Sequence, residues 1–147
     1  ALWKGQTPLL GVIHDFNRGE TFHSVSGGGA FCNGVPIQVS NVGEKDKSIL
    51  VTGFPSLMSH DERSLTVAMR KIGEYKKVRM IGSATLSLAL VACGRADAYF
   101  EEDVMLWDVA AGLAIISEAG GVYTCEQSPR SRWARRVKAA AKGAVAW

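Results

Sequence analysis

The hydrophobic period of this 147-residue chain changes near residue 48. Before that point, short runs of β-forming residues alternate with turn signals such as Gly27-Gly28-Gly29 and Asn33-Gly34, which is typical of antiparallel strands. After it, strand-like and helix-like segments alternate, which is the pattern of an α/β layered sheet. We therefore expect an α/β fold, with antiparallel strands of one sheet in residues 1–47 and a C-terminal α/β domain in residues 48–124.

Hydrophobic spacing and capping residues give the expected elements of the second region. Ser83 and Asp108 are residue types that cap helix N-termini, and Gly120-Gly121 ends the last helix. In chain order we expect a strand at 49–52, a helix at 59–73, a strand at 78–81, a helix at 83–94, a strand at 96–100, a helix at 108–119 and a strand at 122–124.

The positive charge of the chain is concentrated at its end. The formal net charge is +3, which taken alone would suggest an acidic partner such as nucleic acid. Residues 125–147 contain six basic residues and one acidic residue, whereas the preceding 124 contain 11 and 13. We therefore expect an atypical, disordered basic tail at 125–147. We do not expect nucleic acid as a partner, because few aromatic residues lie between the basic ones.

Composition excludes several other classes of protein. The three cysteines form no closely spaced pair, so neither a zinc site nor a disulfide scaffold is expected, and reduced cysteines with Cys93 in the core are typical of a cytoplasmic protein. The longest apolar candidate, residues 81–98, contains Arg95 and Asp97 and does not reach the roughly 18 uncharged residues of a membrane span. No membrane association and no secretory signal are expected.

Two groups of residues could carry chemistry. Glu101, Glu102, Asp103 and Asp108 follow the strand expected at 96–100, where carboxylates could bind a hard cation or act as acid and base. A solvated loop with an ordinary Asp cap is the alternative interpretation. The second group comprises the helix starts at Gly82-Ser83-Ala84 and Trp107-Asp108, whose free N–H groups could bind a polar ligand, although every helix has such an end.

Four segments in this order resemble the inositol monophosphatase family. They are residues 29–40 (GAFCNGVPIQVS), 81–84 (IGSA), 96–101 (ADAYFE) and 107–121, which begins Trp-Asp-x-Ala-Ala-Gly. The similarity extends over residues 1–123. It implies a layered α/β/α/β/α fold and magnesium-dependent, lithium-sensitive hydrolysis of phosphate monoesters.

The resemblance also implies roles for individual residues. Asp108 matches a metal-ligating Asp of the family, Gly82, Ser83 and Ala84 match residues that contact the alcohol part of the substrate, and Glu101 matches an acid that binds a substrate hydroxyl. The family's other metal carboxylates, which precede the matched region, have no counterpart here. We therefore expect the C-terminal portion of such an enzyme, inactive alone.

Several functions stay open at this level. The parent protein is expected to hydrolyse a small phosphorylated substrate, inositol 1-phosphate, with Mg²⁺ as cofactor and as a homodimer. The alternatives are a 3′-phosphoadenosine or histidinol-phosphate phosphatase of the same family, or a non-catalytic interaction module. Because the first sheet would lack part of its cover, aggregation or dimerisation of the chain is expected.

Overall fold

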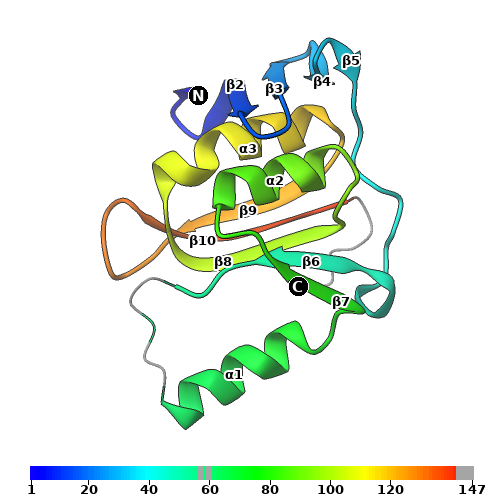
Figure 1. Ribbon diagram of the computed structural model, residues 1–147. Coiled ribbons are helices and arrows are strands. Elements are labelled where there is room, and N and C mark those ends of the chain that lie inside the picture. Colours follow the sequence, from blue (N-terminus) through cyan, green and yellow to red (C-terminus); the bar gives the residue numbers. More distant parts are fainter. Residues whose placement is uncertain (56–57, 59–60, 142–147) are drawn as a thin grey trace.

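The computed structural model describes residues 1–55, 58 and 61–141, which form four layers (Figure 1). An antiparallel sheet lies over helices α2 and α3, these lie on a second sheet, and helix α1 lies beyond that sheet. This arrangement confirms the expected α/β fold. The first sheet has the order β1-β2-β3-β4-β5, with β1 Leu2–Lys4, β2 Thr7–Asp15, β3 Glu20–Val25, β4 Gly29–Cys32 and β5 Val35–Pro36.

The inner face of the first sheet packs closely on α3 (Leu106–Glu118). Ile13 and Phe22 are buried on this face, as the two-residue period of a strand requires. Gly11 is needed there, because a Cβ atom at this position would lie 2.4 Å from the carbonyl oxygen of Ala111. The sheet can therefore approach the helix backbone only where the strand has no side chain.

The outer face of the first sheet is apolar and uncovered. Leu2, Leu10, Val12 and Val25 are between 36% and 57% exposed. Among the described residues, no helix lies on this face (Figure 1). It is the uncovered surface that the sequence led us to expect.

The second sheet is mixed and has the order β7-β6-β8-β10-β9. Strand β6 is parallel to both of its neighbours, whereas β10 is antiparallel to β8 and β9. The carboxyl ends of β6, β7 and β8 therefore meet at one edge. The strands are β6 Ile49–Thr52, β7 Lys77–Met80, β8 Ala98–Met105, β9 Val122–Gln127 and β10 Ala134–Ala140, and a short 3₁₀ helix, η1 Lys45–Lys47, precedes β6.

Helices α2 (Ala84–Ala92) and α3 are apolar on most sides because they lie between two sheets. They pack closely at Gly112, where an added Cβ would lie 2.4 Å from the Cβ of Leu88. Helix α1 (Glu62–Ile72) has no buried residue, and Ile72 packs on a small cluster beneath the second sheet. Residues 59 and 60 of the helix expected at 59–73 lie outside the described residues.

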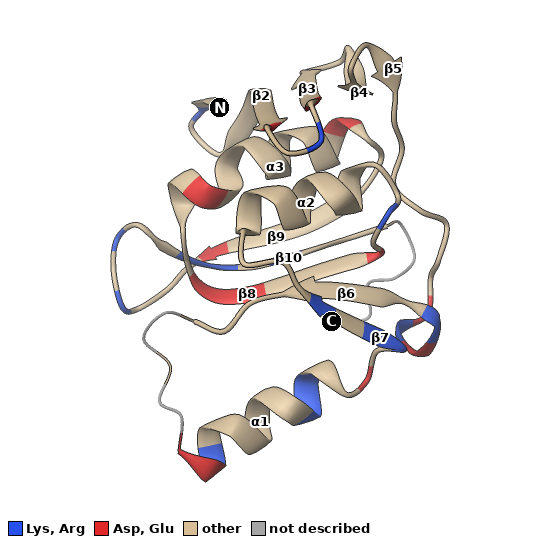
Figure 2. Ribbon diagram, in the orientation of Figure 1, with Lys and Arg blue, Asp and Glu red and all other residues tan. Residues whose placement is uncertain are grey.

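The expectation of a disordered basic tail is wrong for residues 125–141. Strand β9 continues through the proposed boundary after Thr124, and β10 lies between β8 and β9. Val137 and Ala139 are fully buried, while Arg136 and Lys138 project from the other face, as in a half-buried strand; Ala134 and Ala140 at the two ends are buried as well. Figure 2 shows the positive charge of this hairpin on β10 and on the β9–β10 loop. Residues 142–147 lie outside the described part.

The expected end of one strand and start of one helix are also wrong. Strand β8 does not end at Phe100 but runs to Met105, because β10 pairs along it as far as Ala134, opposite Met105. Helix α3 follows at once from Leu106, so Asp108 lies within its first turn and is not its cap. The cap residue is Met105, which makes no side-chain capping bond.

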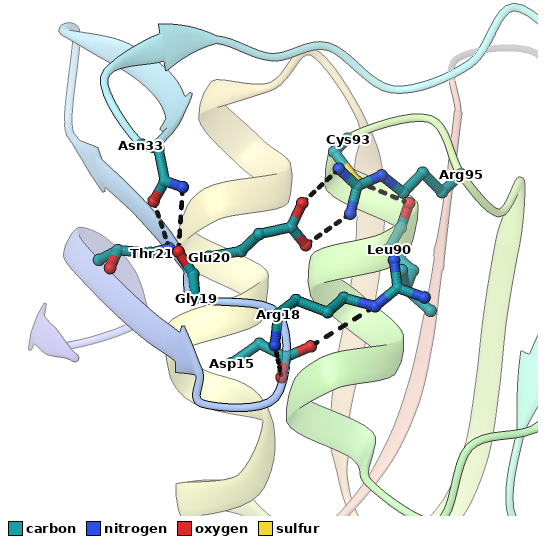
Figure 3. A network of polar contacts seen from close by, with 9 residues as sticks. All are labelled: Asp15, Arg18, Gly19, Glu20, Thr21, Asn33, Leu90, Cys93 and Arg95. Carbon is teal, nitrogen blue, oxygen red and sulfur yellow. Dashed lines mark hydrogen bonds and ion pairs between the residues drawn. The ribbon is translucent and has the colours of Figure 1, made fainter.

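An ion pair joins the first sheet to the turn after α2. Glu20 at the start of β3 accepts two hydrogen bonds of 2.6 Å from the guanidinium of Arg95 (Figure 3). This bidentate contact lowers the pKa of Glu20 below its ordinary value and raises that of Arg95. Beside it, the side chain of Asn33 accepts a hydrogen bond from the Thr21 N–H and donates one to the Gly19 carbonyl, which fixes the β2–β3 turn.

Two further expectations concern membrane-spanning helices and the state of the cysteines. None of the helices in the described part of the chain is long and apolar enough to cross a membrane. Cys32, Cys93 and Cys125 are free thiols, and Cys93 packs against the main core as expected.

Candidate functional site

A cavity of about 500 Å³ lies at the edge of the second sheet where β6 and β7 end and helices α2 and α3 begin. Ligand sites of open α/β sheets favour this edge. The five residues to which the family resemblance gives roles all line this cavity: Gly82, Ser83, Ala84, Glu101 and Asp108. The others that line it are Thr52, Gly53, Phe54, Met80, Thr85, Ser87, Asp103, Val104 and Met105.

The start of α2 forms one wall. Ser83 caps the helix, as expected, because its Oγ accepts a hydrogen bond from the backbone N–H of Leu86 at 3.3 Å. Gly82 has a φ of +77°, a conformation that side chains disfavour, and the space around its missing Cβ is empty. A ligand can therefore approach the helix N-terminus and its free N–H groups closely.

Glu101 is held on the opposite wall by two residues that sequence reasoning missed. The hydroxyl of Tyr99, a fully buried residue, donates a 2.9 Å hydrogen bond to Oε2 of Glu101. At Gly53, an added Cβ would lie 3.0 to 3.1 Å from the three carboxyl atoms of Glu101. Among the described residues, Oε1 of Glu101 accepts no hydrogen bond, so this oxygen can accept one from a ligand.

The surroundings of Glu101 favour its neutral form. Burial raises the pKa of Glu101 above its ordinary value, the hydrogen bond from Tyr99 opposes this shift, and the charge of Asp108 adds to it. A perturbed carboxyl group in a cavity is typical of a functional site.

Asp108 is positioned by contacts of its backbone. Its carbonyl oxygen accepts a 2.7 Å hydrogen bond from the hydroxyl of Thr85, which joins the first turn of α3 to the first turn of α2. Its carboxylate lies in the first turn of a helix, where the helix dipole favours negative charge.

The four acids of the sequence cluster separate into two groups. Glu101 and Asp108 line the cavity and form no ion pair with any other described residue. Asp103 also lines it, but its carboxylate accepts a hydrogen bond from Ser128 and pairs with Arg130 at 2.7 Å. Glu102 lies outside the cavity lining and pairs with Lys71 at 3.0 Å and Arg136 at 3.5 Å. Glu102 and Asp103 therefore lie in strand β8 and not in the solvated loop of the alternative interpretation, and both are held in ion pairs.

Asp108 fits one carboxylate ligand of a divalent metal ion. Mg²⁺ is usually held by one or two carboxylates together with waters and phosphate oxygens. Within the described residues, no group of three or more His, Cys, Asp or Glu side chains could hold a metal ion. Asp108 would therefore share the ion with water, with a phosphate group and with ligands outside this set.

The chain is similar to known proteins over most of its length. A family model described as the inositol monophosphatase family matches residues 1–146, which includes the hairpin that the sequence led us to call atypical. "Nus factor SuhB" of Xylella fastidiosa is 42% identical over 127 residues, covering 86% of this chain and 46% of the relative. "Inositol-1-monophosphatase" of Synechocystis is 39% identical over 128 residues, covering 80% and 42%.

Solved structures give the same result for the fold. The structure of inositol monophosphatase from Anabaena matches with a TM-score of 0.80 at 38% identity, over 92% of this chain and 54% of that one. The chain spans about half the length of the curated relatives it matches.

Proposed function

The chain belongs to the inositol monophosphatase family, and we propose that it forms the half of a phosphate monoester hydrolase that holds the alcohol part of the substrate and one magnesium ligand. The observation that carries this proposal is the convergence of Gly82, Ser83, Ala84, Glu101 and Asp108 on one cavity. These residues come from three different elements, α2 with its preceding turn, β8 and α3.

Each wall of the cavity has a chemical task in this proposal. Oε1 of Glu101 accepts a hydrogen bond from a substrate hydroxyl, while Tyr99 keeps Oε2 in place. The N–H groups at the start of α2 donate to further oxygens of the substrate. Asp108 holds the magnesium ion, which when bound would polarise the phosphate and lower the pKa of a water molecule.

The substrate we favour is inositol 1-phosphate, since a partly buried carboxyl group beside helix N–H groups suits a ring with several hydroxyls. A 3′-phosphoadenosine or histidinol phosphate is the alternative. The test fuses this chain to the part of the Xylella relative that it does not match and measures phosphate release from all three substrates with magnesium. We expect release from inositol 1-phosphate to be fastest; no release from any of them would refute the proposal.

The variant Glu101→Gln in that fusion tests whether Glu101 acts in substrate binding or in the chemical step. Loss of the carboxylate should raise KM for inositol 1-phosphate more than it lowers kcat, because Glu101 holds the alcohol part and not the phosphate. Glu102→Gln, one residue along and outside the cavity lining, is the matched control and should change neither constant. A large fall in kcat alone would assign Glu101 to a different role.

A second candidate function is a non-catalytic interaction role for this chain by itself. The single nominated metal carboxylate and the positive charge of the β9–β10 hairpin favour it. It predicts that the purified 147-residue chain shows no magnesium-stimulated phosphatase activity. Activity that is abolished by Asp108→Asn would refute it.

A further inference from the structure

We propose that two exposed tryptophans and two arginines form a binding surface for single-stranded nucleic acid. This tryptophan-arginine surface consists of Trp107 in the first turn of α3 and Arg132, Trp133 and Arg135 at the end of the β9–β10 loop and the start of β10. The proposal does not depend on hydrolase activity. It assigns a partner to the part of the chain in which basic residues most outnumber acidic ones.

The two tryptophans are placed side by side by the fold. Trp107 is 64% exposed and Trp133 is 42% exposed, and their ring centroids are 6.2 Å apart with the planes tilted by 52°. The backbone N–H of Leu106 donates a 2.9 Å hydrogen bond to the carbonyl of Trp133, which holds the loop against the helix. Two large aromatic rings are therefore presented to solvent on an ordered backbone.

The arginines of this surface have no acidic partner among the described residues. The guanidinium of Arg132 lies 4.4 Å from the centre of the Trp133 ring. Arg135 donates to the carbonyls of Arg132 and Ala134, at 2.8 and 2.9 Å. By contrast, Arg130 pairs with Asp103, and Arg136 lies near Glu102 and Glu126. Figure 2 shows the positive charge on the outer side of this loop.

Exposed aromatic rings beside guanidinium groups that have no acidic partner among the described residues match the chemistry of a single strand. Its bases can stack on tryptophan, while its phosphates are attracted to arginine. In duplex nucleic acid the faces of the bases are already stacked, so a duplex could bind the arginines but not the tryptophan rings. An acidic peptide would likewise leave the rings unused, and a second copy of this surface would bring like charges together.

This proposal departs from the expectation, drawn from the sequence, that nucleic acid is not a partner. Between residues 125 and 141, Trp133 is the only tryptophan among the basic residues, so an aromatic platform is not visible there. The second ring comes from α3, and the pairing of β10 with β8 brings it close.

The test measures fluorescence anisotropy of a labelled oligouridylate of about 12 nucleotides with the 147-residue chain, at several salt concentrations. An oligothymidylate of the same length shows whether the strand can also be DNA, and the annealed duplex is the comparison. Trp133→Ala should weaken binding of the single strand about 5- to 100-fold, the loss of one stacked base, whereas Trp133→Phe should retain most of it. Arg132→Ala should reduce the slope of log affinity against log salt by about 0.7.

Two matched variants lie outside the surface. Phe16→Ala removes an exposed ring in the β2–β3 turn, and Arg63→Ala removes a cation on α1; both should leave affinity unchanged. Circular dichroism of each variant establishes that it is folded. The proposal is overturned if no single strand binds, if the duplex binds as well as the single strand, or if folded Trp133→Ala binds like the unmodified chain.

Discussion

At the scale of single residues, Glu101 lies where its charge destabilises the fold. Its pKa is raised above the ordinary value of 4.5, chiefly by burial, so the folded state binds a proton more tightly than the unfolded state does. The stability contributed by the protonated form is therefore fully present below the unfolded pKa and is lost as pH rises through the folded pKa.

Glu101→Gln should consequently stabilise the 147-residue chain at neutral pH. We expect the variant to melt a few degrees higher at pH 7 and to differ little near pH 4, because glutamine carries no charge to bury. Thermal melts across this pH range measure the effect. The expectation is contradicted if the difference in melting temperature between the variant and the unmodified chain is smaller at pH 7 than at pH 4.

The residues that a ligand could contact, such as Ser83, were recognisable in the sequence. The residues that hold Glu101 in place were not. Ser83 was recognisable because a cap residue follows from its position before an apolar run. Tyr99 looks like an ordinary strand residue, and its hydrogen bond to Glu101 depends on which face of β8 it occupies. Gly53 gives no signal either, because the contact that requires glycine is with a carboxyl group 48 residues later.

At the scale of elements, the contact between α2 and α3 depends on Gly112. Gly112→Ala should destabilise the chain by about 1 to 3 kcal/mol, because the new Cβ would overlap Leu88, although alanine itself favours a helix by about 1 kcal/mol. Urea unfolding measures the change. Ser117→Ala, on the exposed side of the same helix, should stay within about 0.5 kcal/mol, and equal effects of the two variants would contradict this packing.

The ion pair between Glu20 and Arg95 links one sheet to the turn after α2. The pKa of Glu20 is lowered, chiefly by the hydrogen bonds from Arg95, so its contribution is present above the unfolded value and is lost as pH falls through the folded pKa. Glu20→Gln should therefore lower the melting temperature at pH 7. The loss in free energy of unfolding should be less than about 1 kcal/mol, because Arg95 is 41% exposed, and there should be no loss in strong acid.

Glu44→Gln is the control for this prediction. Glu44 pairs with Lys47 on the surface, where both side chains are more than 60% exposed, and the variant should change nothing. A loss of stability for Glu20→Gln that persists in strong acid would show that the side chain acts through packing and not through charge.

Most elements could be predicted from the sequence, but their ends could not. The helix starting after Ser83 and the strand at 49–52 were visible because their apolar spacing is distinct. The end of β8 was not, because acidic residues normally indicate a loop, whereas here β10 pairs with Glu101 and, after a shift of register at Glu102 and Asp103, again with Val104 and Met105. Long-range pairing outweighed local propensity.

At the scale of the whole molecule, the outer face of the first sheet should drive self-association. We expect the 147-residue chain to form oligomers, because Leu10, Val12 and Val25 expose apolar surface together. The double variant Val12→Lys, Val25→Thr should shift it to monomer in light-scattering measurements after gel filtration, without lowering its melting temperature. Val67→Lys on α1 is the control and should not. A monodisperse monomer of the unmodified chain would contradict the prediction.

The basic hairpin shows why the overall organisation was only partly predictable. Ala134–Ala140 forms a strand with four buried residues, but alanine carries little strand signal, and charge dominated the composition. Its place between β8 and β9 follows from contacts that span the domain.

The most direct measurement of the central claim is magnesium-dependent phosphate release by this chain fused to the unmatched part of its Xylella relative, with and without Asp108→Asn. We expect activity on inositol 1-phosphate that Asp108→Asn lowers at least about 100-fold, since loss of a ligand weakens both metal binding and charge stabilisation. Ser64→Ala on α1 should leave it unchanged. Activity that survives Asp108→Asn would contradict the assignment of this residue and of the cavity around it.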